Sequence, residues 1–274
     1  MKEKRAIVEN NEIEILVKEI EKIRSTHPQI GTRKIYFMLS NFKIEHNIKI
    51  GRDCLYDLML SENLLLRKKK RKVKTTNSYH RFKKYPNLIK NLVIHCPNQL
   101  WVSDITYWNI GEKFLYISLI TDAYSHKIVG FNVAENLATL ASIQALKMAI
   151  SEIKNSNIDL IHHSDRGSQY CDTKYVKLLG KNNIKISMTE DGDPRDNAIA
   201  ERINGIIKNE YLKNYDVKNI LEAKKLLAKI VDIYNSERPH NSIGNLTPNE
   251  VHYKNPNFKK LWKNQWETQS QAKK

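Results

Sequence analysis

The chain has 274 residues and carries 46 Lys and Arg against 30 Asp and Glu, a formal net charge of +16. This length predicts one large domain with a small one, or two of moderate size, and a hydrophobic fraction of 41% favours a globular core. No apolar run reaches the roughly 18 residues of a membrane span, no signal peptide is legible, and the three cysteines form no C-x-x-C pair. We therefore expect a soluble, cytoplasmic protein without a disulfide or zinc framework, and the basic excess predicts a nucleic acid partner.

Three helices are predicted at the N-terminal end, over residues 11–28, 31–41 and 51–66. Apolar side chains recur at near-helical spacing in each segment, and Thr32 is expected to be the N-cap of the second helix. Three short helices followed by a basic segment suit a helix-turn-helix module, so residues 1–66 are predicted to be a small all-α DNA-binding domain. A helical adaptor that packs on another protein fits the periodicity equally well.

A basic segment follows. Residues 67–84, "RKKKRKVKTTNSYHRFKK", contain no acidic side chain. We expect residues 67–95 to be a basic linker whose first six side chains contact DNA phosphates, with a strong dependence on salt: Arg67, Lys68, Lys69, Lys70, Arg71 and Lys72. The alternative is a solvated linker with no partner.

Strand patterns begin after the linker. Residues 99–110 and 113–133 are rich in aromatic and β-branched side chains, with Gly111 at the break between them. A helix is predicted over residues 139–153, followed by a short strand over residues 158–165. This order predicts a mixed α/β sheet flanked by helices, with the later strand parallel and buried.

Three carboxylates stand out by their position on the predicted elements. Asp104 lies within the first strand, Asp165 at the end of the later strand, and Glu201 on a helix predicted over residues 196–212. Carboxylates from two strands and a facing helix can converge, and a cation between them would offset their mutual repulsion. Mg²⁺ prefers such oxygen ligands, and two ions can hold the attacking and leaving oxygens of a phosphoryl transfer. By count alone, these could equally be three surface acids.

The motifs around these three carboxylates resemble those of a known family, and this favours metal ligands over ordinary surface acids. Thirty-five residues lie between Asp165 and Glu201, which is similar to the D-D-35-E pattern of retroviral integrases and bacterial transposases. The segments "WVSDITYW", "HHSDRGSQY", "SMTEDGDPRDNAIAERINGIIKNE" and "YNSERPHNSIGNLTPNEV" resemble, in order and spacing, the second-frame transposase product of the insertion-sequence-three family. The resemblance covers residues 98–252, and "PQIGTRKIYFMLS" resembles the helix-turn-helix module of that family.

The resemblance implies a ribonuclease H-like catalytic core, placed at residues 96–255, and a C-terminal tail at 256–274. It implies that Asp104, Asp165 and Glu201 form a catalytic triad binding two Mg²⁺ ions, for which Mn²⁺ would substitute. The implied reaction is cleavage of element ends to give a 3′-hydroxyl, followed by attack of that hydroxyl on another phosphodiester. The implied partners are terminal inverted repeats, target DNA, further copies of the chain on DNA, and an upstream-frame product fused to it; the protein would then associate with the nucleoid.

Further side chains are candidates for accessory roles. Asn204 and Lys208 follow Glu201 by three and seven positions, so we expect them to share its helix face and to contact DNA. His163 and Arg166 flank Asp165 and are candidates for positioning water or phosphate. Arg238 and His240 are predicted to contact the substrate or to brace the core. Three further positions carry open predictions: Asp122 as a turn former or a ligand, and Asp196 or Asn197 as the N-cap of the Glu201 helix.

Two other functions are compatible with these residues. One is a noncatalytic DNA-binding regulator left by a decayed element, and the other is a ribonuclease H-type nuclease. An assay of strand transfer on paired terminal-repeat DNA separates them from a transposase.

Overall fold

The computed structural model describes residues 2–66, 82–111, 113–153, 159–190, 197–254 and 257–258. The chain divides into two compact units, Met1–Val73 and Lys74–Lys274, each of which is described by itself. Among the described residues, no helix is long and apolar enough to cross a membrane.

The first unit is entirely helical. It contains α1 (Lys2–Thr26), α2 (Thr32–Met38), α3 (Ser40–Glu45) and α4 (Arg52–Ser61). The second predicted helix is therefore two helices that meet at Leu39. The prediction of Thr32 as N-cap is wrong, because Gly31 has the extended backbone of the N-cap and Thr32 is already helical.

Apolar side chains from all four segments of this unit form one core. Fully buried members come from α1, α2, the α2–α3 junction and α4, namely Leu16, Ile20, Ile35, Leu39, Leu55 and Met59. The predicted small all-α unit is thus confirmed, whereas its use as a helix-turn-helix remains a prediction. The predicted DNA-contacting residues 67–72 lie outside the described residues.

The second unit is built on a five-stranded sheet with the order β3-β2-β1-β4-β5. The strands are β1 (Leu100–Ile110), β2 (Lys113–Asp122), β3 (Ile128–Ala134), β4 (Ile161–Ser164) and β5 (Lys185–Met188). Strands β1, β2 and β3 form an antiparallel meander, while β4 is parallel to β1 and β5 is parallel to β4. This mixed sheet confirms the predicted fold class.

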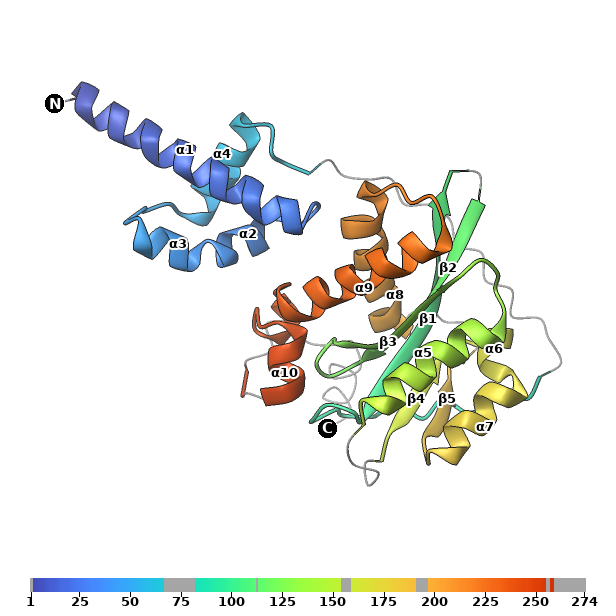
Figure 1. Ribbon diagram of the computed structural model, residues 1–274. Helices are drawn as coiled ribbons and strands as arrows, with labels where there is room; N and C mark the ends of the chain where they lie inside the picture. The colour runs from blue at the N-terminus through green and yellow to red at the C-terminus, as the bar shows by residue number, and fades with distance from the viewer. Residues whose placement is uncertain are drawn as a thin grey trace. The chain divides into compact units, whose positions relative to one another are not determined.

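Helices cover both faces of the sheet (Figure 1). They are α5 (Thr139–Ser151), α6 (Ser168–Cys171), α7 (Thr173–Lys181), α8 (Ala198–Ile206), η2 (Ile207–Tyr211), η3 (Leu212–Asn214), α9 (Ile220–Ser236), η4 (Asn241–Ile243) and α10 (Pro248–Lys254). One apolar cluster joins the sheet to α5 and α7, and a second joins it to α8, η2 and α9.

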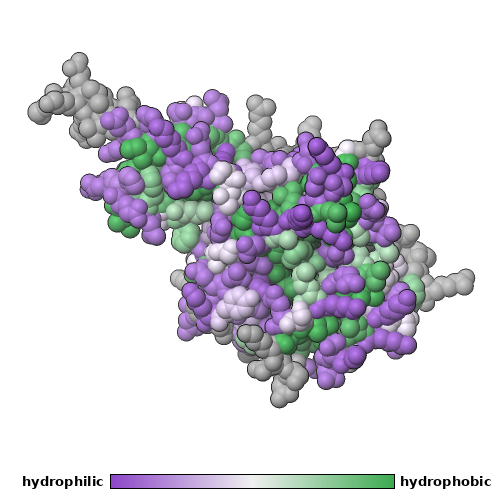
Figure 2. Space-filling model, in the orientation of Figure 1, coloured by the Kyte–Doolittle hydropathy of each residue, from purple (hydrophilic) through white to green (hydrophobic). Residues whose placement is uncertain are grey.

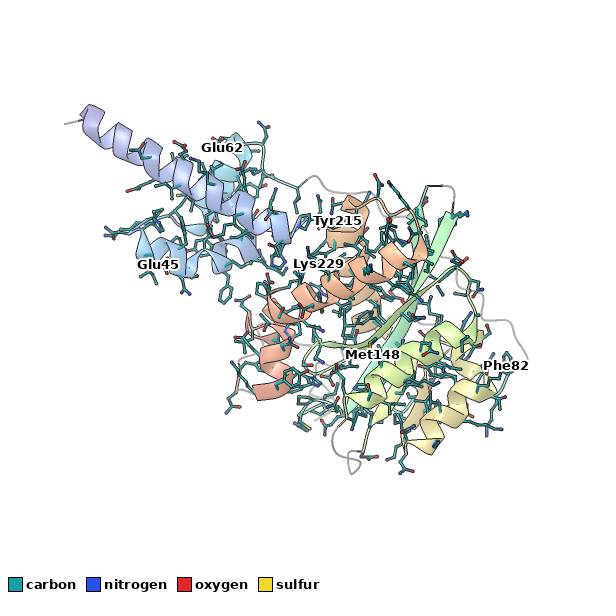
Figure 3. The ribbon with its side chains drawn as sticks, viewed as in Figure 1. Glu45, Glu62, Phe82, Met148, Tyr215 and Lys229 are labelled. Carbon is teal, nitrogen blue, oxygen red and sulfur yellow. The ribbon has the colours of Figure 1, made fainter. Side chains whose placement is uncertain are left out.

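The alternation of side chains along β1 explains these two layers. Trp101 is buried with α5 and α7, whereas Trp108 is buried with α8 and α9, as expected for odd and even positions of one strand. The outer surface of α5 is not wholly polar. Leu140 and Met148 are exposed there, and Figure 2 shows hydrophobic side chains among hydrophilic ones over this part of the molecule. Met148 is labelled in Figure 3.

Candidate active site

Two of the predicted carboxylates lie side by side at the end of β4. Strands β1 and β4 are parallel neighbours, and their last paired positions are Ser103 and Ser164. Asp104 and Asp165 are each the next residue in the chain. Because both strands run in the same direction, the two side chains leave the sheet at the same edge.

Helix α8 is tied to this edge by two amide side chains. Asn197 Nδ2 donates to the carbonyl oxygen of Ser103 at 2.9 Å, and Asn204 Nδ2 donates to Asp104 Oδ2 at 2.9 Å. Asn197 is the N-cap residue of α8, but its side chain makes no capping hydrogen bond, and its Oδ1 accepts no hydrogen bond from the described residues. Asp196 lies outside the described residues. Glu201 stands in the first turn of the same helix.

The surroundings of Asp104 disfavour its charge. Burial raises the pKa of Asp104 to about 7, and the negative charges of Asp165 and Glu201 act in the same direction. Hydrogen bonds from Asn204 and from the backbone N–H of Ile105 partly offset this effect. A proton or a cation is therefore needed beside Asp104 near neutral pH.

Asp165 has a local structural role as well. Its Oδ1 accepts a hydrogen bond from the backbone N–H of Gly167 at 3.0 Å, which closes the turn after β4. A Cβ atom added at Gly167 would lie 3.0 Å from that same oxygen, so the turn suits glycine. Asp165 therefore both closes this turn and lies next to Asp104.

The three carboxylates are not gathered into a finished ligand set. Over the described part of the chain, no three His, Cys, Asp or Glu side chains are close enough together to hold a metal ion. Asp165 and Glu201 nevertheless act on Asp104 electrostatically, as the direction of its pKa shift shows. The oxygen donors and their like charges fit a hard divalent cation. Asp104, Asp165 and Glu201 are the side chains that could hold it.

A buried polar layer lies on the other side of the sheet from α8. His162 Nε2 is 2.7 Å from Ser103 Oγ and 2.9 Å from Tyr175 Oη. Burial lowers the pKa of His162 to about 3, so the ring is neutral. Next to it, Tyr170 is 3% exposed, and its hydroxyl makes no hydrogen bond with the described residues.

The predicted accessory residues have different surroundings. His163 is fully buried, with Nδ1 2.8 Å from Ser187 Oγ, which is a packing position. Arg166 is partly buried in the turn after Asp165. Arg238 is buried and donates to both carboxylate oxygens of Glu210 at 2.9 Å, and its Nη1 lies 3.0 Å from His240 Nε2. Arg238 and His240 are therefore engaged in bracing contacts within the protein.

Asp122 is the last residue of β2. It pairs with Trp101 at the start of β1, while Asp104 pairs with Leu119. Its Oδ1 accepts from the backbone N–H of Ser125 at 2.7 Å, and its Oδ2 accepts from the N–H of Asn98 at 2.7 Å. Of the two interpretations of Asp122, the structure favours the turn former.

Lys208 lies in the π-helical turn η2 that follows α8. Its Nζ is 3.6 Å from the centre of the Tyr107 ring on β1. In a continuous α-helix Lys208 would share the face of Glu201, but a π turn changes the angular position of the residues in it. Asn204 keeps the expected direction toward Asp104.

Two family models match the second unit, both described as an integrase core domain, at residues 94–194 and 182–248. The chain is 36% identical over 225 residues to the "uncharacterized 31 kDa protein" of insertion element IS600 of Shigella sonnei, covering 81% of each chain. It is 31% identical to the transposase of IS629 from the same organism, over 86% of this chain and 78% of the relative. The chain belongs to the insertion-sequence transposases with an integrase core.

A solved structure agrees with this family at the level of the fold. The transposase matches a chain in the simian T-cell lymphotropic virus intasome in complex with PP2A regulatory subunit B56 gamma, with a TM-score of 0.52 and 14% identity. The match covers 89% of this chain and 78% of that chain. The family models and the relatives confirm the predicted family and the class of polynucleotidyl transferase, and this solved structure agrees with the integrase-like ribonuclease H fold.

Sequence reasoning missed several residues of the transposase site. Asn197 was considered only as a cap, although its amide joins α8 to β1. Tyr107 and Tyr170 stand in the motifs "WVSDITYW" and "HHSDRGSQY". Their place in these motifs marks both residues as candidates. Nothing in the spacing indicates that Tyr107 is exposed and Tyr170 is buried.

Proposed function

We propose that this transposase cleaves the ends of its insertion sequence and joins them to target DNA, with Asp104, Asp165 and Glu201 as the catalytic carboxylates. The observation that carries the proposal is the edge formed by β1, β4 and α8. Asp104 and Asp165 follow paired positions of two parallel strands, and the helix of Glu201 is bonded to Asp104 itself.

The same three carboxylates are the proposed holders of two divalent ions, Mg²⁺ or Mn²⁺. When bound, such ions supply activation of water or of a DNA 3′-hydroxyl and neutralise charge on the phosphate oxygens. The raised pKa of Asp104 supports this assignment, because a cation relieves the repulsion from Asp165 and Glu201.

Other side chains of the transposase position these groups. Asn204 fixes one oxygen of Asp104, while its own Oδ1 is buried and has no hydrogen-bond partner among the described residues. That oxygen is available to accept a hydrogen bond from water or from a DNA hydroxyl. We assign the contact with the DNA strand beyond the reacting phosphate to Lys208.

The partners of the transposase follow from the reaction. Joining two ends requires terminal inverted repeats, target DNA and more than one copy of the chain on DNA. Residues 1–66 are proposed to recognise DNA, residues 67–95 to track its phosphates through Arg67 to Lys72, and residues 96–255 to catalyse. A fusion with an upstream-frame product would add further DNA contacts.

A strand-transfer assay on terminal-repeat DNA with Mg²⁺ tests the proposal. We expect the wild-type chain, alone or fused to its upstream frame, to join ends, and Asp104→Asn, Asp165→Asn and Glu201→Gln to lose joining while still binding DNA. Asp216→Asn, a change at an exposed acid of the same unit, is the matched control and should retain activity. If the wild-type chain binds the DNA but joins no ends, the result supports the noncatalytic regulator. If the wild-type chain hydrolyses the DNA but joins no ends, the result supports the nuclease. Equal joining by wild type and triad variants would remove the carboxylates from the mechanism.

A further inference from the structure

An exposed aromatic pair lies on the hairpin whose first strand carries Asp104. Tyr107 and Phe114 stand on adjoining strands of the β1–β2 hairpin and are 47% and 49% exposed. Their ring centres are 5.8 Å apart with planes at 84°, an edge-to-face contact. In Figure 1 this end of the hairpin extends beyond α5.

The β4 side of β1 has no strand partner at this point. β4 pairs with β1 only from Leu100 to Ser103, so the part of β1 that carries Tyr107 has a sheet neighbour on the β2 side alone. The segment α8–η2 runs along the open side. In chain order, Asn197 contacts Ser103, Asn204 contacts Asp104, and Lys208 contacts Tyr107.

A cation lies against one ring of the pair. The ammonium group of Lys208 lies 3.6 Å from the Tyr107 ring centre, which fixes the ring by a cation–π contact. Aromatic rings beside ammonium groups are the chemistry that binds single-stranded nucleic acid, since rings stack on bases and cations pair with phosphates.

We propose that Tyr107 and Phe114 form a stacking site for an unpaired DNA base close to the reacting phosphodiester, with Lys208 on the adjoining phosphate. This proposal rests on the proposed function of the Asp104 edge. Tyr107 follows Asp104 by three positions of β1, a rise of about 10 Å at about 3.3 Å per residue, and Lys208 links its ring to the helical segment that carries Glu201. The stacked base should thus lie within the first few nucleotides from the cleaved position.

The test uses the full chain and a DNA duplex with a short single-stranded 3′ overhang, carrying 2-aminopurine at each overhang position in turn. We expect wild type to quench the fluorescence at one position, and Tyr107→Phe to do the same. Tyr107→Ala should lose the quenching and bind the overhang DNA about tenfold more weakly, while its affinity for blunt duplex stays unchanged. Phe114→Ala should show a smaller loss in the same direction.

Tyr253→Ala is the matched control. Tyr253 is 67% exposed and also lies near a lysine, with Lys127 Nζ 5.1 Å from its ring centre, but it belongs to α10. Quenching that persists in Tyr107→Ala, or an equal loss in Tyr253→Ala, overturns the stacking site. Thermal unfolding identifies a variant that fails to fold, in which case Tyr107→Leu carries the same expectation. Strand transfer measured in parallel keeps the two proposals separate, because the stacking site can fail while the wild-type chain still joins ends.

Discussion

Asp104 holds a charge that the protein fold itself disfavours. Its oxygens accept hydrogen bonds from Asn204 and from Ile105, yet burial and two neighbouring acids still raise its pKa to about 7. An enzyme that positions carboxylates for a cation must tolerate their repulsion when the cation is absent. At Asp104, the arrangement that serves the proposed reaction therefore lowers the stability of the fold.

Asp104→Asn is expected to stabilise the protein while abolishing strand transfer. An acid whose pKa is raised on folding is penalised at pH values above its unfolded pKa, and the penalty is complete above pH 7. At pH 8 with EDTA, the free energy of unfolding should rise by about 1 to 3 kcal/mol, and at pH 4 the gain should vanish. Urea unfolding at both pH values measures this. A loss of stability at pH 8 would show that Asp104 is held by structural contacts.

His162 provides a pH dependence of the opposite kind. Burial lowers its pKa to about 3, whereas the unfolded ring titrates near 6.5, so only the unfolded state takes up this proton between those values. Stability is complete above about pH 6.5 and falls as the pH falls, by up to about 1.4 kcal/mol per pH unit from this group. His162→Gln should flatten the curve of unfolding free energy between pH 6 and 4. Curves of equal slope would mean that His162 is protonated in the folded state.

At the scale of elements, the π turn η2 is held by one buried ion pair. Glu210 lies in η2, and Arg238 follows α9 and binds it with two nitrogens at 2.9 to 3.0 Å. The same turn carries Lys208 to the ring of Tyr107. Lys208 and Arg238 are thirty positions apart in the chain, and the turn η2 links the two motifs that contain them. Arg238 acts on the candidate site through η2.

Glu210→Gln should therefore destabilise the core unit by about 2 to 4 kcal/mol, because it leaves the charge of Arg238 buried and unpaired. The double variant Glu210→Gln with Arg238→Met should recover part of this loss. Asp159→Asn is the control, since its pair with Lys185 is exposed, with an expected change below about 0.5 kcal/mol. Urea unfolding compares the four proteins. A loss of similar size in Asp159→Asn would show that the cost of breaking an ion pair in this unit does not depend on its burial.

The helices and strands differ in how well the sequence predicts them. Strands β1 and β2 are ten or more residues long and rich in aromatic and β-branched side chains, so their pattern is legible. Strand β5 has four residues, too few to establish an alternation by themselves, and α7 was not predicted although Tyr175 and Leu179 stand four positions apart on its buried face. The bond from Asn204 to Asp104 agrees with helical spacing. The contact of Lys208 with Tyr107 could not be predicted, since it depends on a π turn and on where β4 ends.

For the whole molecule, the sequence indicates a division that the contacts also show. The chain separates into units at Val73 and Lys74, within the basic segment of residues 67–84. Each unit has its own apolar core. The division predicted from the basic segment thus agrees with two separately packed units.

The last prediction concerns this basic segment and its dependence on salt. If Arg67 to Lys72 neutralise phosphates, replacing all six by glutamine should weaken binding to any duplex and reduce the slope of log K against log salt by up to about five. A control variant changes three exposed lysines of α9, Lys224, Lys225 and Lys229, of which the last is labelled in Figure 3. Its slope should change by less than about one, because these side chains lie on the helix that covers the core and carry no assigned phosphate contact. Fluorescence anisotropy over a range of salt concentrations measures both slopes. Equal slopes in the wild type and the six-residue variant would mean that side chains outside residues 67–72 make the phosphate contacts, and the assignment of DNA binding to this segment would be wrong.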